Sequence, residues 1–141
     1  MQTSTPLERI TERVSRNGDP NDPDTPRPLL RLAEFFDGNE VVGSIGCNLP
    51  GTPAPHVLHQ ALKAIAERPD VVDVRVAVTA FDDPDWPFSD TVYVVTSASP
   101  TDVQSWFSEE LAPDDTWEGL DGRHEEYAVP EGYRAVCCWW D

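Results

Sequence analysis

The segment from Val71 to Ala80 constrains the fold most strongly. Four valines, at positions 72, 74, 76 and 78, alternate with Asp73, Arg75, Ala77 and Thr79. Successive side chains of a strand point to opposite faces of a sheet, so this alternation predicts a strand with one covered face. A cover is available just before it. The segment 54–68 carries one continuous apolar helical face, made of Val57, Leu58, Ala61, Leu62, Ile65 and Ala66.

The order of elements predicts an α+β fold. Further strands are expected over 41–49, 91–97 and 133–140, and a second helix over 100–111. From Val41 onward this order is β-α-β-β-α-β, which is the ferredoxin-like order, with an antiparallel sheet and both helices on one face. In it, strands 41–49 and 71–80 run parallel. An extra strand over 29–36 is expected to form a hairpin with 41–49, and its place in the sheet stays open.

The N-terminal part reads as a separate segment. Thr5, Pro6 and Glu8 form a capping box that starts a short helix with Leu7, Ile10 and Val14 on one stripe. Residues 17–28 are rich in Pro and Asp and predict a linker. We therefore divide the chain into a helix and linker over 1–28 and a single α+β domain over 29–141. The stripe is expected to dock on that domain or on a second chain.

Charge limits the classes of partner. The chain has 26 acidic and 10 basic residues, a net charge of −16, and residues 29–141 carry −15 of it. Nucleic acids and anionic membranes attract clustered Lys and Arg, so neither is an expected partner. A basic protein or a cation fits the charge. Without an apolar run of 18 residues or a secretory signal pattern, a cytoplasmic location is expected.

Two acidic groups carry the leading functional prediction, a module that binds and neutralises or regulates a basic protein, as small inhibitors do. Residues 109–131 hold nine acids. The ferredoxin-like order places this segment and the loop 81–89 at the same end of the sheet. Trp86 or Trp117 would anchor the partner inside an acidic rim; the alternative is a solvated loop with its aromatics in the core. The predicted partner-binding residues are Asp82, Asp83, Asp85, Trp86, Asp114, Asp115, Trp117 and Glu118.

A second functional prediction is a small-molecule or metal site near the loop 81–89. His56 and His59 have the i, i+3 spacing that can face one ligand, and Cys47 approaches the same end. A third metal ligand is not evident, so we expect no stoichiometric zinc and no cofactor. Catalysis is not expected, because no nucleophile or phosphate-loop motif is present and no cluster of basic residues lies near Cys47 to activate its thiol.

The C-terminal strand places unusual residues on both faces of the sheet. Cys137 and Cys138 are adjacent and point apart, so all three cysteines are expected to be reduced thiols. Trp139 and Trp140 also point to opposite faces, one into the core and the other outward. The outward tryptophan marks either a homodimer face or the floor of an apolar ligand site.

Overall fold

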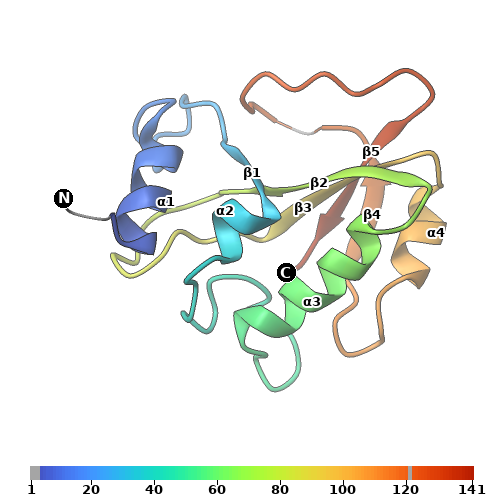
Figure 1. The fold of residues 1–141 in the computed structure, drawn as a ribbon, viewed down its shortest axis with the longest axis horizontal. Helices are drawn as coiled ribbons and strands as arrows, with labels where there is room; N and C mark the ends of the chain where they lie inside the picture. The colour runs from blue at the N-terminus through green and yellow to red at the C-terminus, as the bar shows by residue number, and fades with distance from the viewer. Residues whose placement is uncertain (1–3, 121) are drawn as a thin grey trace.

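The structure is a computed structural model that describes residues 4–120 and 122–141. Within these residues the helices are α1 (Pro6–Ser15), α2 (Leu32–Phe36), α3 (Pro55–Ala66) and α4 (Pro100–Ser105). The strands are β1 (Leu29–Arg31), β2 (Val71–Ala77), β3 (Thr91–Thr96), β4 (Asp115–Glu118) and β5 (Arg134–Trp139). They form one antiparallel sheet in the order β1-β2-β3-β5-β4 (Figure 1). The predicted α+β class with an antiparallel sheet is confirmed.

The ferredoxin-like order itself is not confirmed, because the predicted strand over 41–49 is wrong. This segment forms turns, and Gly43 and Gly46 adopt positive φ angles of 92° and 65° that bend the chain out of an extended path. Ile45 is still buried, but its strand-like pairing is a single bridge to Ser89. The place beside β2 is taken by β1, which runs antiparallel to it.

The predicted strand over 29–36 is correct only for its first three residues. β1 ends at Arg31, whose backbone N–H donates to Glu34 Oε1 at 2.9 Å. This contact satisfies a backbone donor at the start of a helix and favours the turn into α2. The expected hairpin between 29–36 and 41–49 is therefore also wrong, and Phe35 and Phe36 reach the core from a helix.

The helices lie on one face of the sheet, as predicted. Leu58, Leu62 and Ile65 of α3 and Val103 of α4 share one buried cluster with alternate residues of the strands. The strand residues in that cluster are Leu30, Val71, Val74, Val76, Val92, Val94, Val136 and Cys138. Trp140 also enters this cluster, and its indole N–H donates to Leu111 O at 2.9 Å. In the described part of the chain, no helix is long and apolar enough to span a bilayer.

One of the four alternating valines does not join the core. Val74, Val76 and Val78 are buried, whereas Val72 is 48% exposed. The register between β2 and β3 shifts between Val71 and Asp73. An extra residue at such a bulge turns its side chain away from the face set by the alternation, so the prediction that Val72 packs under the helices is wrong.

The N-terminal helix docks on the body of the chain. The capping box of Thr5 and Glu8 is present, and Ile10 and Val14 belong to the same buried cluster as α3. Gly38 has a φ of 77°, and a Cβ atom there would lie 2.4 Å from Pro6 Cβ. A glycine at this turn thus allows α1 to approach closely.

Candidate binding groove

Trp86 is not available as an anchor for a partner. It is 3% exposed, lies in the main core cluster, and donates from its indole N–H to Phe35 O at 3.1 Å. The prediction of an exposed Trp86 was wrong because it rested on the acidic character of the loop 81–89 as a whole. The tryptophan of this loop nevertheless folds back against α2 and contributes to the core.

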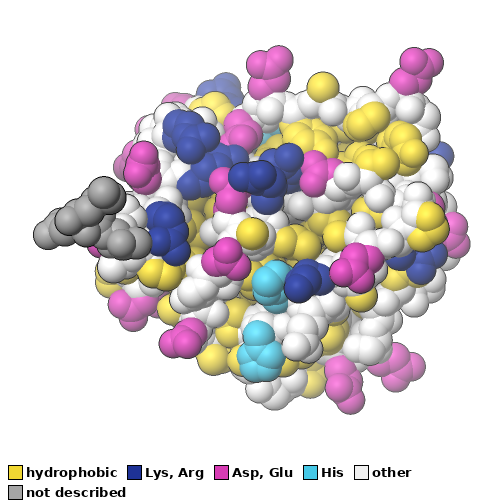
Figure 2. All heavy atoms as spheres, viewed as in Figure 1, with side chains coloured by type: hydrophobic (Ala, Val, Ile, Leu, Met, Phe, Trp, Pro, Cys, Tyr) yellow, Lys and Arg dark blue, Asp and Glu magenta, His cyan; other side chains and the backbone are white. Residues whose placement is uncertain are grey.

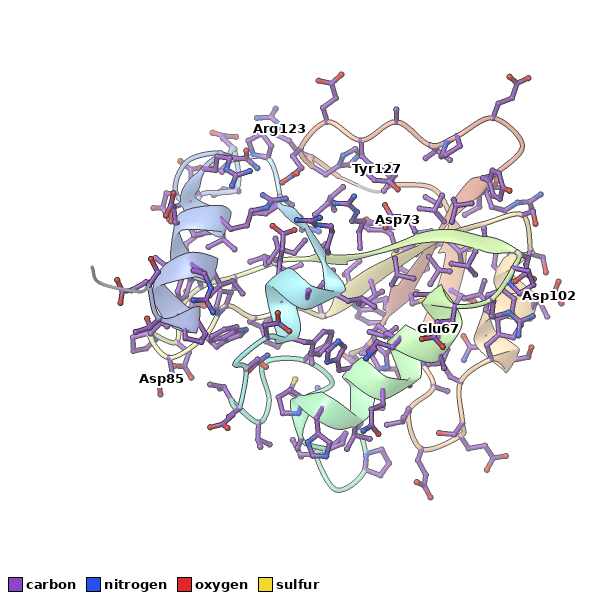
Figure 3. All side chains as sticks on the ribbon, viewed as in Figure 1. Glu67, Asp73, Asp85, Asp102, Arg123 and Tyr127 are labelled. Carbon is purple, nitrogen blue, oxygen red and sulfur yellow. The ribbon has the colours of Figure 1, made fainter. Side chains whose placement is uncertain are left out.

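The two predicted acidic groups line different surfaces. Asp82 and Asp83 are exposed and border a cleft with Val41 and Gly43, and Asp85 lies on the same β2–β3 connection (Figure 3). The second group, Asp114, Asp115 and Glu118, is exposed on and beside β4, an edge strand of the sheet. Figure 2 shows Asp and Glu spread around the visible face instead of gathered at one place.

His56, His59 and Cys47 do not form a metal site. Among the described residues, no group of three His, Cys, Asp or Glu side chains is placed to hold a metal ion. His56 is exposed, and His59 stacks on Phe36 with ring centroids 4.5 Å apart. Burial lowers the pKa of His59, with help from the nearby charge of Lys63. His59 thus serves packing as a neutral ring.

An open groove lies on the face of the sheet away from the helices. Paired residues of neighbouring strands have their side chains on the same face of the sheet. Thr91 of β3 pairs with Trp139 of β5. Cys137 of β5 pairs with Tyr93 of β3 on one side and with Trp117 of β4 on the other, so these side chains lie on the same outer face. The groove has a volume of about 430 Å³. Its aromatic walls are Phe88, Tyr93, Trp117 and Trp139, and its polar groups are Arg27, Thr79, Asp90 and Thr91.

The other half of this outer face is covered by residues 119–120 and 122–132, here named the strap. Figure 1 shows the strap on the opposite side of the sheet from α3. Leu120, Tyr127 and Val129 pack on a second buried cluster made of Leu29, Ala77, Tyr93, Ala135 and Cys137. The groove is therefore the part of the outer face that the strap leaves open.

Tyr127 fixes the middle of the strap to β2. Its hydroxyl donates to Asp73 Oδ2 at 2.5 Å, and Figure 3 shows the two side chains facing each other. Asp73 also pairs with Arg75 at 2.8 Å. Burial, together with this hydrogen bond to a carboxylate, raises the pKa of Tyr127 to about 12, so the hydroxyl stays a donor.

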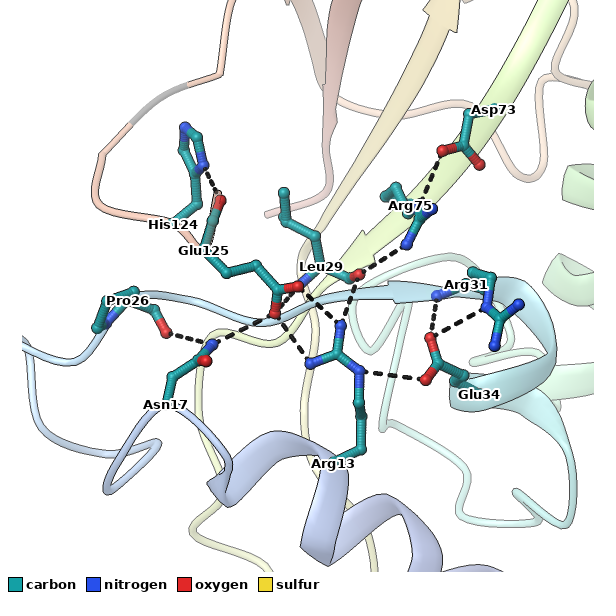
Figure 4. A network of polar contacts seen from close by, with 10 residues as sticks. All are labelled: Arg13, Asn17, Pro26, Leu29, Arg31, Glu34, Asp73, Arg75, His124 and Glu125. Atoms are coloured by element: carbon teal, nitrogen blue, oxygen red, sulfur yellow. Dashed lines mark hydrogen bonds and ion pairs between the residues drawn. The ribbon is translucent and has the colours of Figure 1, made fainter. Parts of the chain in front are cut away.

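Arg13 and Glu125 fix the N-terminal part of the strap to α1 and β1 (Figure 4). Glu125 accepts two hydrogen bonds from the Arg13 guanidinium, both at 2.9 Å, and others from Leu29 N and Asn17 Nδ2. Arg13 also pairs with Glu34 at 3.1 Å. Burial opposes charge at all three groups, but the mutual contacts prevail: they lower the pKa of both carboxyls and raise that of Arg13.

The buried thiol of Cys138 is not a suitable nucleophile. All three cysteines are unbridged, and Cys137 and Cys138 are buried on opposite faces of β5. Burial, with the neighbouring Cys137, raises the pKa of Cys138 well above its usual range. A protonated thiol is a weak nucleophile, so Cys138 contributes to packing.

The groove unites residues that the sequence left apart. Trp117 was a predicted site residue, and an outward tryptophan from the pair Trp139–Trp140 was expected as a ligand floor. Arg27, Thr79, Tyr93 and Asp90 were missed as site residues. They come from a linker, a connection and a central strand, and only the strand pairing brings them together.

The comparisons with known proteins agree along the whole chain. Residues 5–138 match the family model described as "Uncharacterized protein YfbO family". The chain belongs to the YfbO family. It is similar to "Uncharacterized protein YfbO" of Escherichia coli (strain K12), at 54% identity over 139 residues, which is 97% of this chain and 99% of the relative. No solved structure matches significantly.

Proposed function

We propose that this YfbO-family protein binds a small, flat, largely apolar molecule in the outer-face groove. One observation carries the proposal: three partly exposed aromatic side chains, Phe88, Trp117 and Trp139, line an open volume of about 430 Å³. Ligand sites are concave, mostly apolar and aromatic, and hold a few polar groups that orient the ligand. Aromatic side chains that line a groove instead of filling the core are suited to stacking on a planar partner.

The floor of the groove is rigid. Tyr93, Cys137 and Trp117 stand side by side on three hydrogen-bonded strands, and Trp139 extends the row opposite Thr91. The strap borders this row and is held by Glu125 and Tyr127 through the contacts described above. A rigid floor loses little conformational entropy on binding.

Titration calorimetry with 1-naphthol, a flat and neutral probe, tests the groove. We expect saturable binding at one site, and we expect Trp139→Ala to weaken it about 10-fold, equivalent to ~1.4 kcal/mol. The matched control is Tyr133→Ala, which removes an exposed aromatic ring at the other end of β5. Absence of saturable binding, or equal affinity of the wild type and Trp139→Ala, would contradict the proposal.

A second candidate function is the binding of a basic protein at β4, as a neutralising or regulatory module. A specific observation favours it. Asp114, Asp115 and Glu118 are all exposed around Trp117 on an edge strand. Gly119 N–H donates to Ala135 O at 2.8 Å, so the backbone of Gly119 points toward β5. Along an antiparallel strand the backbone groups of successive residues point alternately toward the partner and away from it. Those of Thr116 and Glu118 therefore point toward the open edge. An extended basic segment would find both acceptors and charge there.

A photo-crosslinking amino acid at position 118 tests this second function in native lysate. We expect a basic protein to be captured at low salt, and capture to fall at high salt and in the variant Asp114→Asn/Asp115→Asn. The control, Asp82→Asn/Asp83→Asn, changes net charge equally on the other acidic loop. If capture fell equally in both double variants, it would depend only on the net charge of the protein, which would contradict a binding site at β4.

A further inference from the structure

Two arginines lie at the linker end of the groove. A smaller cleft of about 230 Å³, lined among others by Arg27, Arg123, Thr25 and Thr79, adjoins the groove and shares Arg27 and Thr79 with it. The two hollows therefore lie next to each other. The aromatic groove thus adjoins, at Arg27 and Thr79, a cleft that is lined by two arginines.

The backbone holds these two arginines next to each other. Arg27 N–H donates to Arg123 O at 3.0 Å, and Glu125 N–H donates to Arg27 O at 2.9 Å. Arg123 Nη1 donates to Asp24 O at 2.8 Å, which fixes its side chain against the linker, and Figure 3 shows Arg123 where the strap meets this segment. Asn21 ties the same linker to Phe81 through two hydrogen bonds.

Neither arginine has a carboxylate partner within ion-pair distance in residues 4–120 and 122–141. Arg13, Arg31, Arg68, Arg75 and Arg134 each have such a partner, whereas Arg9 and Arg16, near the exposed ends of α1, have none among the described residues either. Asp22 lines the cleft too, but its Oδ1 accepts from Asp24 N–H at 2.9 Å within its own turn. Two neighbouring positive charges repel each other, and a bound anion offsets this cost.

We propose that the groove and the cleft form one site for a planar aromatic molecule that carries an oxyanion. The aromatic body would lie against Trp139 and Phe88, which are partly exposed in the groove, and the oxyanion would lie between Arg27 and Arg123. Guanidinium groups suit this role because their planar fork matches the oxygens of a carboxylate or a phosphate. This inference rests on the proposed ligand-binding function and names the ligand class. It also assigns Arg27 and Arg123 as residues that determine specificity.

The test compares four probes by titration calorimetry at pH 8: 1-naphthyl phosphate, 1-naphthoate, 1-naphthol and inorganic phosphate. We expect at least one of the two naphthyl anions to bind 10-fold or more tightly than 1-naphthol, and the better one identifies the oxyanion as phosphate or carboxylate. Arg123→Gln should remove this advantage and leave the affinity for 1-naphthol unchanged. Arg27→Gln should reduce it as well. Arg16→Gln, a change at an exposed arginine after α1, should alter nothing.

The outcomes separate this inference from the proposed function. If 1-naphthol binds and neither anion binds more tightly, the groove stands and the oxyanion site is overturned. The joined site is also overturned if inorganic phosphate alone binds as tightly as 1-naphthyl phosphate, because the aromatic body would then contribute nothing. If none of the naphthyl probes binds, the proposed function itself fails.

Discussion

Replacing Arg13 by methionine is expected to lower the free energy of unfolding by about 2–4 kcal/mol. The guanidinium lies between the carboxylates of Glu34 and Glu125 and also donates to Leu29 O at 3.1 Å. Its loss would leave two partly buried carboxylates facing each other without a counter-charge. Breaking a buried pair costs about 3–5 kcal/mol, and the expected value is lower because both carboxylates are about a quarter exposed.

Urea unfolding at several pH values measures this effect and its cause. The contacts lower the pKa of Glu34 and Glu125 in the folded state. Their contribution to stability is therefore complete above the ordinary glutamate pKa of about 4.3 and is lost as the pH falls through the folded-state pKa. In Arg13→Met, the decrease in the free energy of unfolding on acidification should be much smaller than in the wild type. The control is Arg16→Met, at the exposed residue that follows α1, where we expect almost no change. Similar stability of Arg13→Met and the wild type at pH 7 would contradict the role of this ion pair.

Replacing Leu62 by alanine is expected to cost about 2–5 kcal/mol, the range for buried leucines. Leu62 is fully buried in the middle of α3 and belongs to the cluster that joins α3 to β2, β3 and β5. Alanine is a good helix former, so the cost would come from the cavity and from lost apolar contacts. Chemical denaturation gives the change in free energy directly.

Val72→Ala is the informative comparison for Leu62→Ala. Sequence alternation places Val72 in the same core, but the bulge turns it to solvent. We therefore expect a change within about 0.5 kcal/mol, as for exposed positions. If Val72→Ala lowered the free energy of unfolding as much as Leu62→Ala, Val72 would be packed in the core, as the sequence alternation predicts, and the bulge in β2 would be contradicted.

Periodic patterns predicted the elements in which local and tertiary preferences agree. The helix expected over 54–68 is α3, and the strands expected over 71–80, 91–97 and 133–140 are β2, β3 and β5. The segment 41–49 has apolar residues at strand spacing, but its glycines favour turns. β4 was missed because Asp115–Glu118 has no apolar alternation. It is a strand because β5 offers an open edge for pairing.

The site was predicted less completely than the fold. Trp117 could be found from sequence as an aromatic residue in an acidic segment. The outward tryptophan could be found because a strand places neighbouring side chains on opposite faces. Arg27 and Tyr93 could not, because their places in the groove depend on β1, on the strap and on a strand order that no local pattern encodes. The position of the strap could not be predicted for a similar reason. Glu125 and Tyr127 bind Arg13 and Asp73, which lie far away in the sequence.

The indole N–H resonances of the five tryptophans provide the most direct test that the outer-face groove is the ligand site. Each tryptophan gives one signal in a ¹H–¹⁵N spectrum, and Trp117 and Trp139 are the two that line the groove. During a titration with 1-naphthol, we predict saturable shifts for these two signals and little change for Trp86, Trp106 and Trp140. Shifts confined to Trp86, which borders the cleft of Asp82 and Asp83, or to Trp106 on the helix side would contradict the account.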